Sequence, residues 1–267
     1  MDWLEALILG IIQGLTEFLP VSSSGHLEIS KAILGVEIED NLTFNIVVHA
    51  ATVCSTIIVF RKDLRALFSG FFEIKWNFET QYISKIILSS IPVIFVGLFL
   101  KSQVESLFSS DTGDQRSKLL FIAFMLFITA LLLAFTYYAK PKNKSISFLH
   151  AFIIGLAQAF AVLPGISRSG ATIATALLLK NSREDAARFS FLMVLLPILG
   201  KAGMDLISGK MNSEAIHIFP LIVGFSSAFI VGLLACKLMI RIVKNSKLIY
   251  FAIYCALVAG LTLFFSI

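Results

Sequence analysis

The sequence predicts an all-α, polytopic membrane protein that forms a single integral membrane domain over residues 1–267. Hydrophobic residues make up 57% of the chain and charged residues only 15%, whereas soluble domains are usually about half apolar and about a quarter charged. The apolar residues also gather into long stretches that short runs of charge separate. The net charge of +5 is then expected from Lys and Arg in loops at a membrane surface, with no nucleic-acid partner. The alternative, a soluble protein with a very large core, fits this composition poorly.

Six stretches are long and apolar enough to cross a bilayer, which takes about 20 residues in a helix. Charges or turn residues bound each of them, such as "RKDLR" after the first and "KPKNK" after the third. The predicted spans run roughly from Leu42 to Phe60, Ile83 to Leu100, Leu119 to Tyr138, Ala186 to Leu206, Ile218 to Ile240 and Leu248 to Ile267.

Two further apolar regions, about Trp3 to Leu34 and about Ile146 to Leu179, are interrupted by "LPVSSSG" and "LPGISRSG". Since proline ends a helix and serine often begins one, each region predicts two short helices joined by a loop. Each half is short for a full crossing, so we expect a re-entrant hairpin that dips into the membrane and returns. Irregular backbone at that depth requires protein or a water-filled cavity around it.

The two predicted hairpins resemble each other at a constant offset of 145 residues. Three predicted spans follow each hairpin, which gives ten helices and two repeats, about residues 1–140 and about 145–267. Because three is odd, the second repeat starts from the opposite face, so we expect inverted repeats whose hairpin tips meet near the midplane. The alternative is a chance similarity of two Ser-Gly turns. The matching pairs are Gly10 and Gly155, Gln13 and Gln158, Ser22 and Ser167, Ser24 and Ser169, and Gly25 and Gly170.

The distribution of charge predicts the orientation in the membrane. One face holds the loops after the first, third and fifth spans and the flanks of the second hairpin, and it carries fourteen Lys and Arg residues. The other face carries mainly four. Basic residues favour the cytoplasmic face. We therefore expect both termini and the mouth of the first hairpin to lie outside.

A carboxylate lies near the tip of the first hairpin. Gln13 and Glu17 are four residues apart and therefore share one face of a helix. An ionisable side chain at membrane depth is costly, and its presence indicates a functional site.

Several polar residues follow Pro20 at the same tip. The hydroxyls of Ser22, Ser23 and Ser24 are suited to capping the next helix, binding a ligand or attacking one. The N–H groups at a helix start favour an anion, and Gly25 lets the backbone approach a ligand closely. His26 carries the side chain best suited to moving protons near neutral pH.

The second tip, "PGISRSGAT", repeats this arrangement and adds Arg168. The guanidinium group matches the geometry of phosphate. Two helix starts and one arginine that face each other predict a site for a small polyanion such as a diphosphate. A divalent cation that bridges Glu17 and the phosphate oxygens would explain a carboxylate beside an anion.

These residues also have structural interpretations, which the sequence leaves open. Glu17 and Arg168 would then only pair with each other, or Arg168 would only hold hairpin carbonyls. The serines would only cap helices, and His26 would be a hydrogen-bonded buried side chain. His49, in the first span, either lines the cavity or, as we slightly prefer, bonds a neighbouring helix. The convergence of these polar residues at tips that are expected to meet favours a site.

The two tips carry motifs that resemble the signatures of the undecaprenyl-diphosphate phosphatase family, also called the bacitracin-resistance family. The stretches are "QGLTEFLPVSSSGH" and "LPGISRSGAT". In the family the first motif is Glu or Gln, three residues, then Glu, which Gln13 and Glu17 match. The second, Pro-Gly-x-Ser-Arg-Ser-x-x-Thr, is matched by Pro164, Gly165, Ser167, Arg168, Ser169 and Thr172.

This resemblance implies hydrolysis of undecaprenyl diphosphate to undecaprenyl phosphate and inorganic phosphate at the outer face of the bacterial cytoplasmic (inner) membrane. That reaction would recycle the lipid carrier for peptidoglycan synthesis and confer bacitracin resistance. The resemblance also implies a divalent cation, Mg²⁺ or Ca²⁺, as cofactor. The polyprenyl tail of the substrate would lie among the membrane lipids.

The resemblance implies roles position by position. Glu17 would be the essential carboxylate and the metal ligand, Ser23 the nucleophile, His26 the proton carrier and Arg168 the phosphate clamp. The residues expected to contact the substrate are Gln13, Ser22, Ser24, Gly25, Ser167, Ser169, Gly170 and Thr172.

The competing hypothesis is a lipid-carrier flippase or another inverted-repeat transporter, because broken helices at the midplane also occur in transporters. The set of Glu, Ser, His and Arg favours hydrolysis, since transport needs no nucleophile. The sequence leaves open whether serine or water attacks and whether the protein forms a homodimer.

Overall fold

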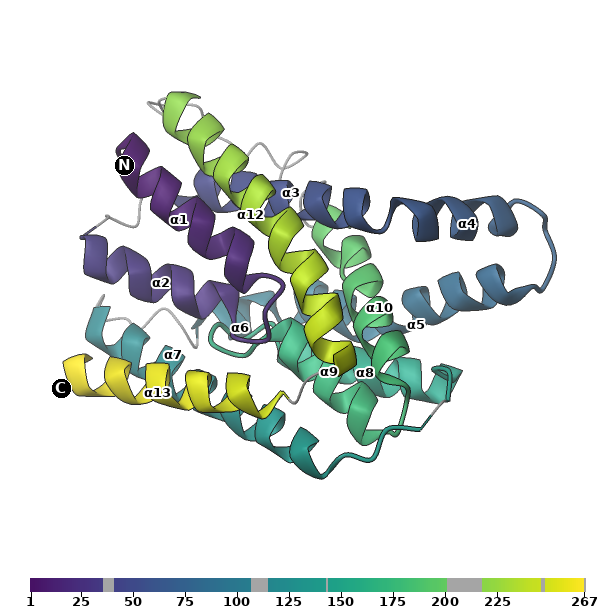
Figure 1. Cartoon of the computed structure of the whole chain (residues 1–267). Coiled ribbons are helices and arrows are strands. Elements are labelled where there is room, and N and C mark those ends of the chain that lie inside the picture. Colours follow the sequence, from purple (N-terminus) through teal and green to yellow (C-terminus); the bar gives the residue numbers. More distant parts are fainter. Residues whose placement is uncertain (36–40, 107–114, 143, 201–217, 246–247, 267) are drawn as a thin grey trace.

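The structure is a computed structural model of the chain, and it describes residues 1–35, 41–106, 115–142, 144–200, 218–245 and 248–266. These residues are almost entirely helical and include no β-strand (Figure 1). The prediction of an all-α protein is confirmed.

Both interrupted regions form two short helices joined by a non-helical tip, as predicted. The helices are α1 (Trp3–Thr16), α2 (Ser23–Leu34), α8 (Phe148–Phe160) and α9 (Arg168–Leu178).

The second helix of each hairpin begins with the same hydrogen bonds. The Gly25 N–H donates to the Ser22 hydroxyl at 3.3 Å, and the Gly170 N–H donates to the Ser167 hydroxyl at 3.0 Å. Such caps satisfy N–H groups that a helix start leaves without partners. The two caps fall 145 residues apart, which is the offset between the two motifs.

Four of the remaining helices are long and apolar enough to cross a membrane: α5, α7, α12 and α13. They correspond to the predicted second, third, fifth and sixth spans, so the chain is a multi-pass membrane protein. The helices outside the hairpins whose bounds the structure describes are α3 (Asn41–Val59), α4 (Arg61–Phe71), α5 (Phe78–Phe99), α6 (Lys101–Ser106), α7 (Gln115–Phe135), η1 (Thr136–Tyr138), α10 (Arg183–Met193), α12 (Ile218–Asn245) and α13 (Ile249–Ser266).

The predicted first span forms α3, but the charged segment that follows it is a helix and not a loop. After a bend of 74° at Phe60 the chain continues as α4, so "RKDLR" begins a helix. Leu64 and Leu67 recur at helical spacing among the charges, and such a pattern forms an amphipathic surface helix. Figure 1 shows α4 and α5 projecting together from the rest of the molecule.

The predicted fourth span, Ala186 to Leu206, lies partly outside the described residues. Within them, α10 ends at Met193 and the helix resumes at Leu195. Pro197 explains this interruption, because it has no N–H to donate to the carbonyl of Met193 four residues earlier.

Each hairpin packs against a long helix of the other half of the chain. Helix α1 lies along α12, and α8 lies along α5, while α7 packs against α13 (Figure 1). Glycines permit the close approach of α1 and α12: a Cβ atom at Gly14 would lie 2.6 Å from the Ala228 carbonyl oxygen and 2.9 Å from the Gly232 nitrogen. Small residues at such contacts are typical of helix packing in membranes.

Replacement of Gly14 by Val is expected to separate α1 from α12 and to lower the stability of the fold by about 1–3 kcal/mol, the usual cost of overpacking. Gly260→Val is the matched control, because nothing lies within 4 Å of a Cβ atom at Gly260. Thermal unfolding in detergent, followed with a thiol-reactive fluorophore that detects buried Cys236 and Cys255, measures both. Equal shifts in the two variants would contradict this packing.

Candidate active site

The two hairpin tips meet inside the molecule, as the sequence predicts. The Ser169 hydroxyl donates to the Leu19 carbonyl at 3.1 Å. A Cβ atom at Gly25 would lie 3.2 Å from the Gly165 Cα atom, so the two backbones are almost in contact. Residues that are far apart in the sequence therefore share one site.

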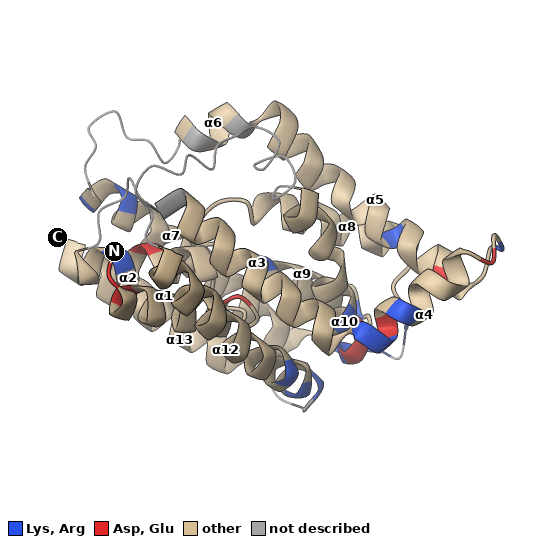
Figure 2. Ribbon diagram, turned by 90° about the horizontal axis from the view of Figure 1, so that it is seen from above, with Lys and Arg blue, Asp and Glu red and all other residues tan. Residues whose placement is uncertain are grey.

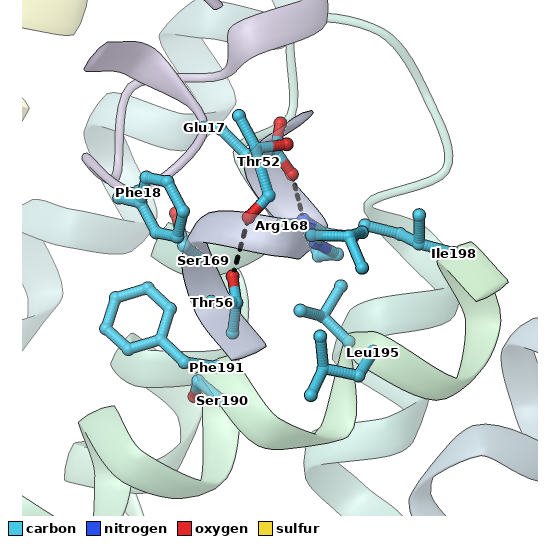
Figure 3. A pocket seen from close by; sticks show the side chains of 12 residues that line it. Glu17, Phe18, Thr52, Thr56, Arg168, Ser169, Ser190, Phe191, Leu195 and Ile198 are labelled. Carbon is cyan, nitrogen blue, oxygen red and sulfur yellow. Dashed lines mark hydrogen bonds and ion pairs between the residues drawn. The ribbon is translucent and has the colours of Figure 1, made fainter. Parts of the chain in front are cut away.

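A single carboxylate connects the predicted residues at this junction. Glu17 is 8% exposed, and its Oε1 atom pairs with the guanidinium group of Arg168 (Figure 3). Its Oε2 atom accepts hydrogen bonds from the Ser23 hydroxyl at 2.6 Å and from the Gln13 amide at 3.0 Å. Four sequence-predicted residues thus converge on one another.

His49 of α3 lies beside this carboxylate. Its Nε2 atom is 3.9 Å from Glu17 Oε2, and its Nδ1 atom is 2.7 Å from the Asn45 carbonyl oxygen. A carbonyl only accepts hydrogen bonds, so Nδ1 carries the hydrogen and Nε2 faces the carboxylate. Of the two interpretations of His49 that the sequence leaves open, this position agrees with a place in the site.

His26 faces a different neighbour. Its Nδ1 atom donates to the Ser22 carbonyl at 2.8 Å, and its Nε2 atom lies 2.9 Å from the Tyr254 hydroxyl. The two rings stack with their centres 5.6 Å apart. Neither ring nitrogen contacts the Ser23 hydroxyl in the hydrogen bonds of the described residues. Sequence reasoning missed Tyr254, although a hydroxyl within an apolar span is a signal that a buried partner exists.

The first tip is held in a strained backbone conformation. Ser22 has a φ angle of 70°, in the left-handed region that residues other than glycine rarely adopt. This conformation lets the Ser22 carbonyl accept from both the N–H and the ring of His26. Ser22 caps the helix, and the Ser24 hydroxyl lies 3.4 Å from the Ser22 hydroxyl.

A threonine that sequence reasoning did not identify as part of the site holds the second tip by hydrogen bonds. Thr129 of α7 donates to the Gly165 carbonyl at 2.9 Å and accepts from the Ser167 N–H at 2.9 Å. The Thr172 hydroxyl donates to the Arg168 carbonyl within α9 at 2.9 Å. These contacts fix the backbone on both sides of Arg168 and leave its side chain to reach Glu17.

A small cavity opens beside the Glu17–Arg168 pair (Figure 3). Apolar and hydroxyl side chains make up most of its lining. Among these, the Ser190 hydroxyl is buried and has no hydrogen-bond partner within the described part of the chain. The lining residues that sequence reasoning missed are Phe18, Thr52, Val53, Thr56, Ser190, Phe191, Val194, Leu195 and Ile198.

The donor groups at the junction fit a divalent cation, but protein ligands are few. No cluster of three or more His, Cys, Asp or Glu side chains suited to a metal occurs among the residues that the structure describes. Glu17 offers a carboxylate, and the Gln13 Oε1 atom is buried without a hydrogen-bond partner in that same part of the chain. A cation here would complete its coordination with phosphate oxygens and water, as Mg²⁺ commonly does.

Comparison with known proteins relates the whole chain to one family. A family model described as bacitracin resistance protein BacA matches residues 6–261. A protein of Bacteroides fragilis named undecaprenyl-diphosphatase is 55% identical over 267 residues, covering 98% of each chain. Proteins of the same name are 56% identical in Parabacteroides distasonis, with 98% of this chain and 97% of the relative covered, and 36% identical in Methanosphaera stadtmanae, with 100% and 99% covered.

The Glu17–Arg168 pair predicts unequal costs for removing its two members. Arg168→Met leaves the Glu17 carboxylate, whose side chain is 6% exposed, without its counter-ion, and breaking a buried pair in this way costs about 3–5 kcal/mol. Glu17→Gln removes the more buried charge and leaves Arg168, 25% exposed, so it is expected to cost less. Thermal unfolding in detergent compares the two, and a larger loss for Glu17→Gln would show that the carboxylate does not depend on Arg168.

Proposed function

The chain belongs to the bacitracin resistance protein BacA family, and from this premise we propose how its two hairpin tips carry out the family's reaction. The protein hydrolyses undecaprenyl diphosphate to undecaprenyl phosphate and inorganic phosphate, in the context of peptidoglycan synthesis and bacitracin resistance. The observation that carries the mechanism is the contact of Ser23, Glu17 and Arg168 where the tips meet.

In the proposed mechanism, Arg168 binds the terminal phosphate through its planar guanidinium group. To do so it exchanges its bond with Glu17 for bonds with phosphate oxygens. Its position at the first turn of α9 adds the N–H groups of a helix start to the anion site. The hydroxyls of Ser24 and Ser169, which lie at the same two tips, would contribute weakly to binding of the phosphate.

The Ser23 hydroxyl is the proposed nucleophile. Its oxygen forms a bond to the terminal phosphorus, the bond from that phosphorus to the bridging oxygen breaks, and undecaprenyl phosphate leaves. The proton of Ser23 passes to Glu17 Oε2, 2.6 Å from the Ser23 oxygen. A general base that activates a nucleophile lies within hydrogen-bond distance of it. Water then cleaves the phosphoserine, which releases inorganic phosphate and restores the hydroxyl.

His26 is the proposed proton carrier to the departing phosphate, and it would act in the imidazolium form, which has a hydrogen on Nε2 as well as the one on Nδ1 that the Ser22 carbonyl accepts. It follows Ser23 by three residues on α2 and therefore lies on the same side of the helix. Its Nε2 atom would exchange the Tyr254 hydroxyl for the phosphate. A divalent cation, Mg²⁺ or Ca²⁺, would be held by Glu17 and, when bound, would neutralise charge on the phosphate oxygens.

We also propose that the two halves of the chain are inverted repeats. The exchange of partners supports this. The first hairpin packs against α12, which forms the second of the three predicted spans after hairpin two, and the second hairpin packs against α5, which forms the second predicted span after hairpin one. The last long helices of the halves, α7 and α13, pack against each other. A two-fold relation between repeats accounts for all three contacts at once.

The proposed location is the cytoplasmic (inner) membrane, with the first hairpin opening to the outer face. Lys and Arg gather on α4, α10 and the C-terminal end of α12 (Figure 2), and a concentration of basic residues favours the cytoplasmic side. The site then faces the outer leaflet, with the polyprenyl tail of the substrate in the bilayer.

Replacement of the reacting groups is expected to abolish most hydrolysis. Ser23→Ala removes the nucleophile and Arg168→Lys removes the planar fork, so phosphate release from undecaprenyl diphosphate in detergent should fall roughly 10²- to 10⁴-fold. Ser84→Ala is the control, because that hydroxyl donates to the Thr80 carbonyl within its own helix, α5. Undiminished hydrolysis by Glu17→Gln and Arg168→Ala would refute the assignment of the site.

The orientation is tested with single cysteines in a chain that lacks Cys54, Cys236 and Cys255. A membrane-impermeant maleimide added to intact cells is expected to label Asp2→Cys and to label Lys142→Cys and Lys244→Cys only after lysis. The opposite pattern would reverse the orientation and leave the chemistry of the site unchanged.

A further inference from the structure

The imidazole of His26 is held at both of its nitrogens. Nδ1 donates to the Ser22 carbonyl at 2.8 Å, and Nε2 lies 2.9 Å from the Tyr254 hydroxyl of α13. The imidazole and phenol rings are almost parallel, with 8° between their planes and 5.6 Å between their centres, which is an offset stack. Together these contacts fix the orientation of the imidazole, and two of the three come from Tyr254.

The hydroxyl of Tyr254 suits a ring nitrogen that gains and loses a hydrogen, because a hydroxyl both donates and accepts hydrogen bonds. When the ring is neutral, Nε2 accepts from the Tyr254 O–H. When the ring is an imidazolium, Nε2 donates to the Tyr254 oxygen, and in both forms Nδ1 donates to the Ser22 carbonyl. The ring of His26 therefore keeps its orientation in both protonation states, between which a proton carrier alternates.

Helix α13 also contacts the backbone of the first tip. Next to Tyr254, the buried thiol of Cys255 is a weak donor that faces the Pro20 carbonyl at 3.8 Å. Thr129 of α7 holds the second tip in a similar way. Helices α7 and α13 are the last helices of the two halves, so each hairpin tip is supported by the last helix of the other half. Tyr254 differs from Thr129 in that it holds a side chain with a proposed chemical role.

We propose that Tyr254 is a positioning residue for the hydrolysis, which holds Nε2 of His26 in place between its proton transfers. The proposal rests on the proposed function, in which His26 gives a proton to the departing phosphate. After that transfer the ring is neutral, and Nε2 accepts from the Tyr254 hydroxyl. The water that cleaves the phosphoserine then bonds to phosphorus through its oxygen and returns a proton to Nε2, while Glu17 returns to Ser23 the proton that it took.

Tyr254→Phe tests this, because it removes the hydroxyl and keeps the stacked ring. A catalytic group that is misplaced by about 1 Å can lose about 100-fold in rate, so we expect kcat for phosphate release from undecaprenyl diphosphate in detergent to fall about 10- to 100-fold. Since the hydroxyl acts on the chemical step, kcat and kcat/KM should fall equally. Tyr250→Phe is the matched control and should keep the wild-type kcat, because Tyr250 lies one turn earlier on α13 and is 70% exposed.

The same change in a chain that carries His26→Ala separates positioning from packing. A residue that acts through His26 has no further effect once the imidazole is gone, so Tyr254→Phe should cost little additional activity in that chain. An equal loss in both chains would overturn the proposal, because Tyr254 would then only support the fold.

Nitrogen-15 NMR of the full-length protein in detergent, labelled at its four histidines, tests the contact without the reaction. Tyr254→Phe is expected to shift the Nε2 resonance of His26 and to leave that of His150, which bonds Asn181 at 2.9 Å, unchanged. An unchanged His26 resonance would overturn the proposal and leave the proposed function intact. Undiminished hydrolysis by His26→Ala would instead remove His26 from the proposed function, and the role of Tyr254 with it.

Discussion

The pairing of Glu17 with Arg168 joins the two hairpin tips, and the rest of the site depends on it. A carboxylate that is 8% exposed carries a desolvation cost that only a counter-ion and several hydrogen bonds offset. Arg168, Ser23 and Gln13 provide them. The same carboxylate therefore orients Ser23, the proposed nucleophile, and pairs with Arg168, the proposed phosphate ligand. In the proposed mechanism, substrate binding exchanges one anion for another on Arg168.

The backbone on both sides of this pair is held by hydrogen bonds from side chains. The hydroxyls of Ser22 and Ser167 each accept from one N–H in the first turn of α2 and α9. Thr129 of α7 donates to one carbonyl and accepts from one N–H of the second tip. Backbone polar groups without partners are very costly in an apolar surrounding. Close glycine contacts then bring α1 against α12, so the tip reaches the middle of the molecule.

Local sequence signals predicted much of this arrangement. Pro20 and the serines after it interrupt the helix through local effects that need no tertiary contact. The two motifs identify Glu17, Ser23 and Arg168 from the sequence alone. Thr129 and Tyr254 were beyond prediction, because their partners lie 38 and 228 residues away and neither belongs to a motif. Helix α4 was also missed, because charges such as those of "RKDLR" are expected both at the end of a membrane span and on the polar face of a new helix.

Whether the two tips form one reaction site can be tested with a structure determined with a non-hydrolysable polyprenyl diphosphate. We expect the terminal phosphorus about 3–3.5 Å from the Ser23 Oγ atom, the distance of a group poised for attack. We also expect the same phosphate to bind the guanidinium group of Arg168, which has left Glu17. A diphosphate bound away from either residue, with the Glu17–Arg168 pair intact, would show that the two tips do not form one reaction site.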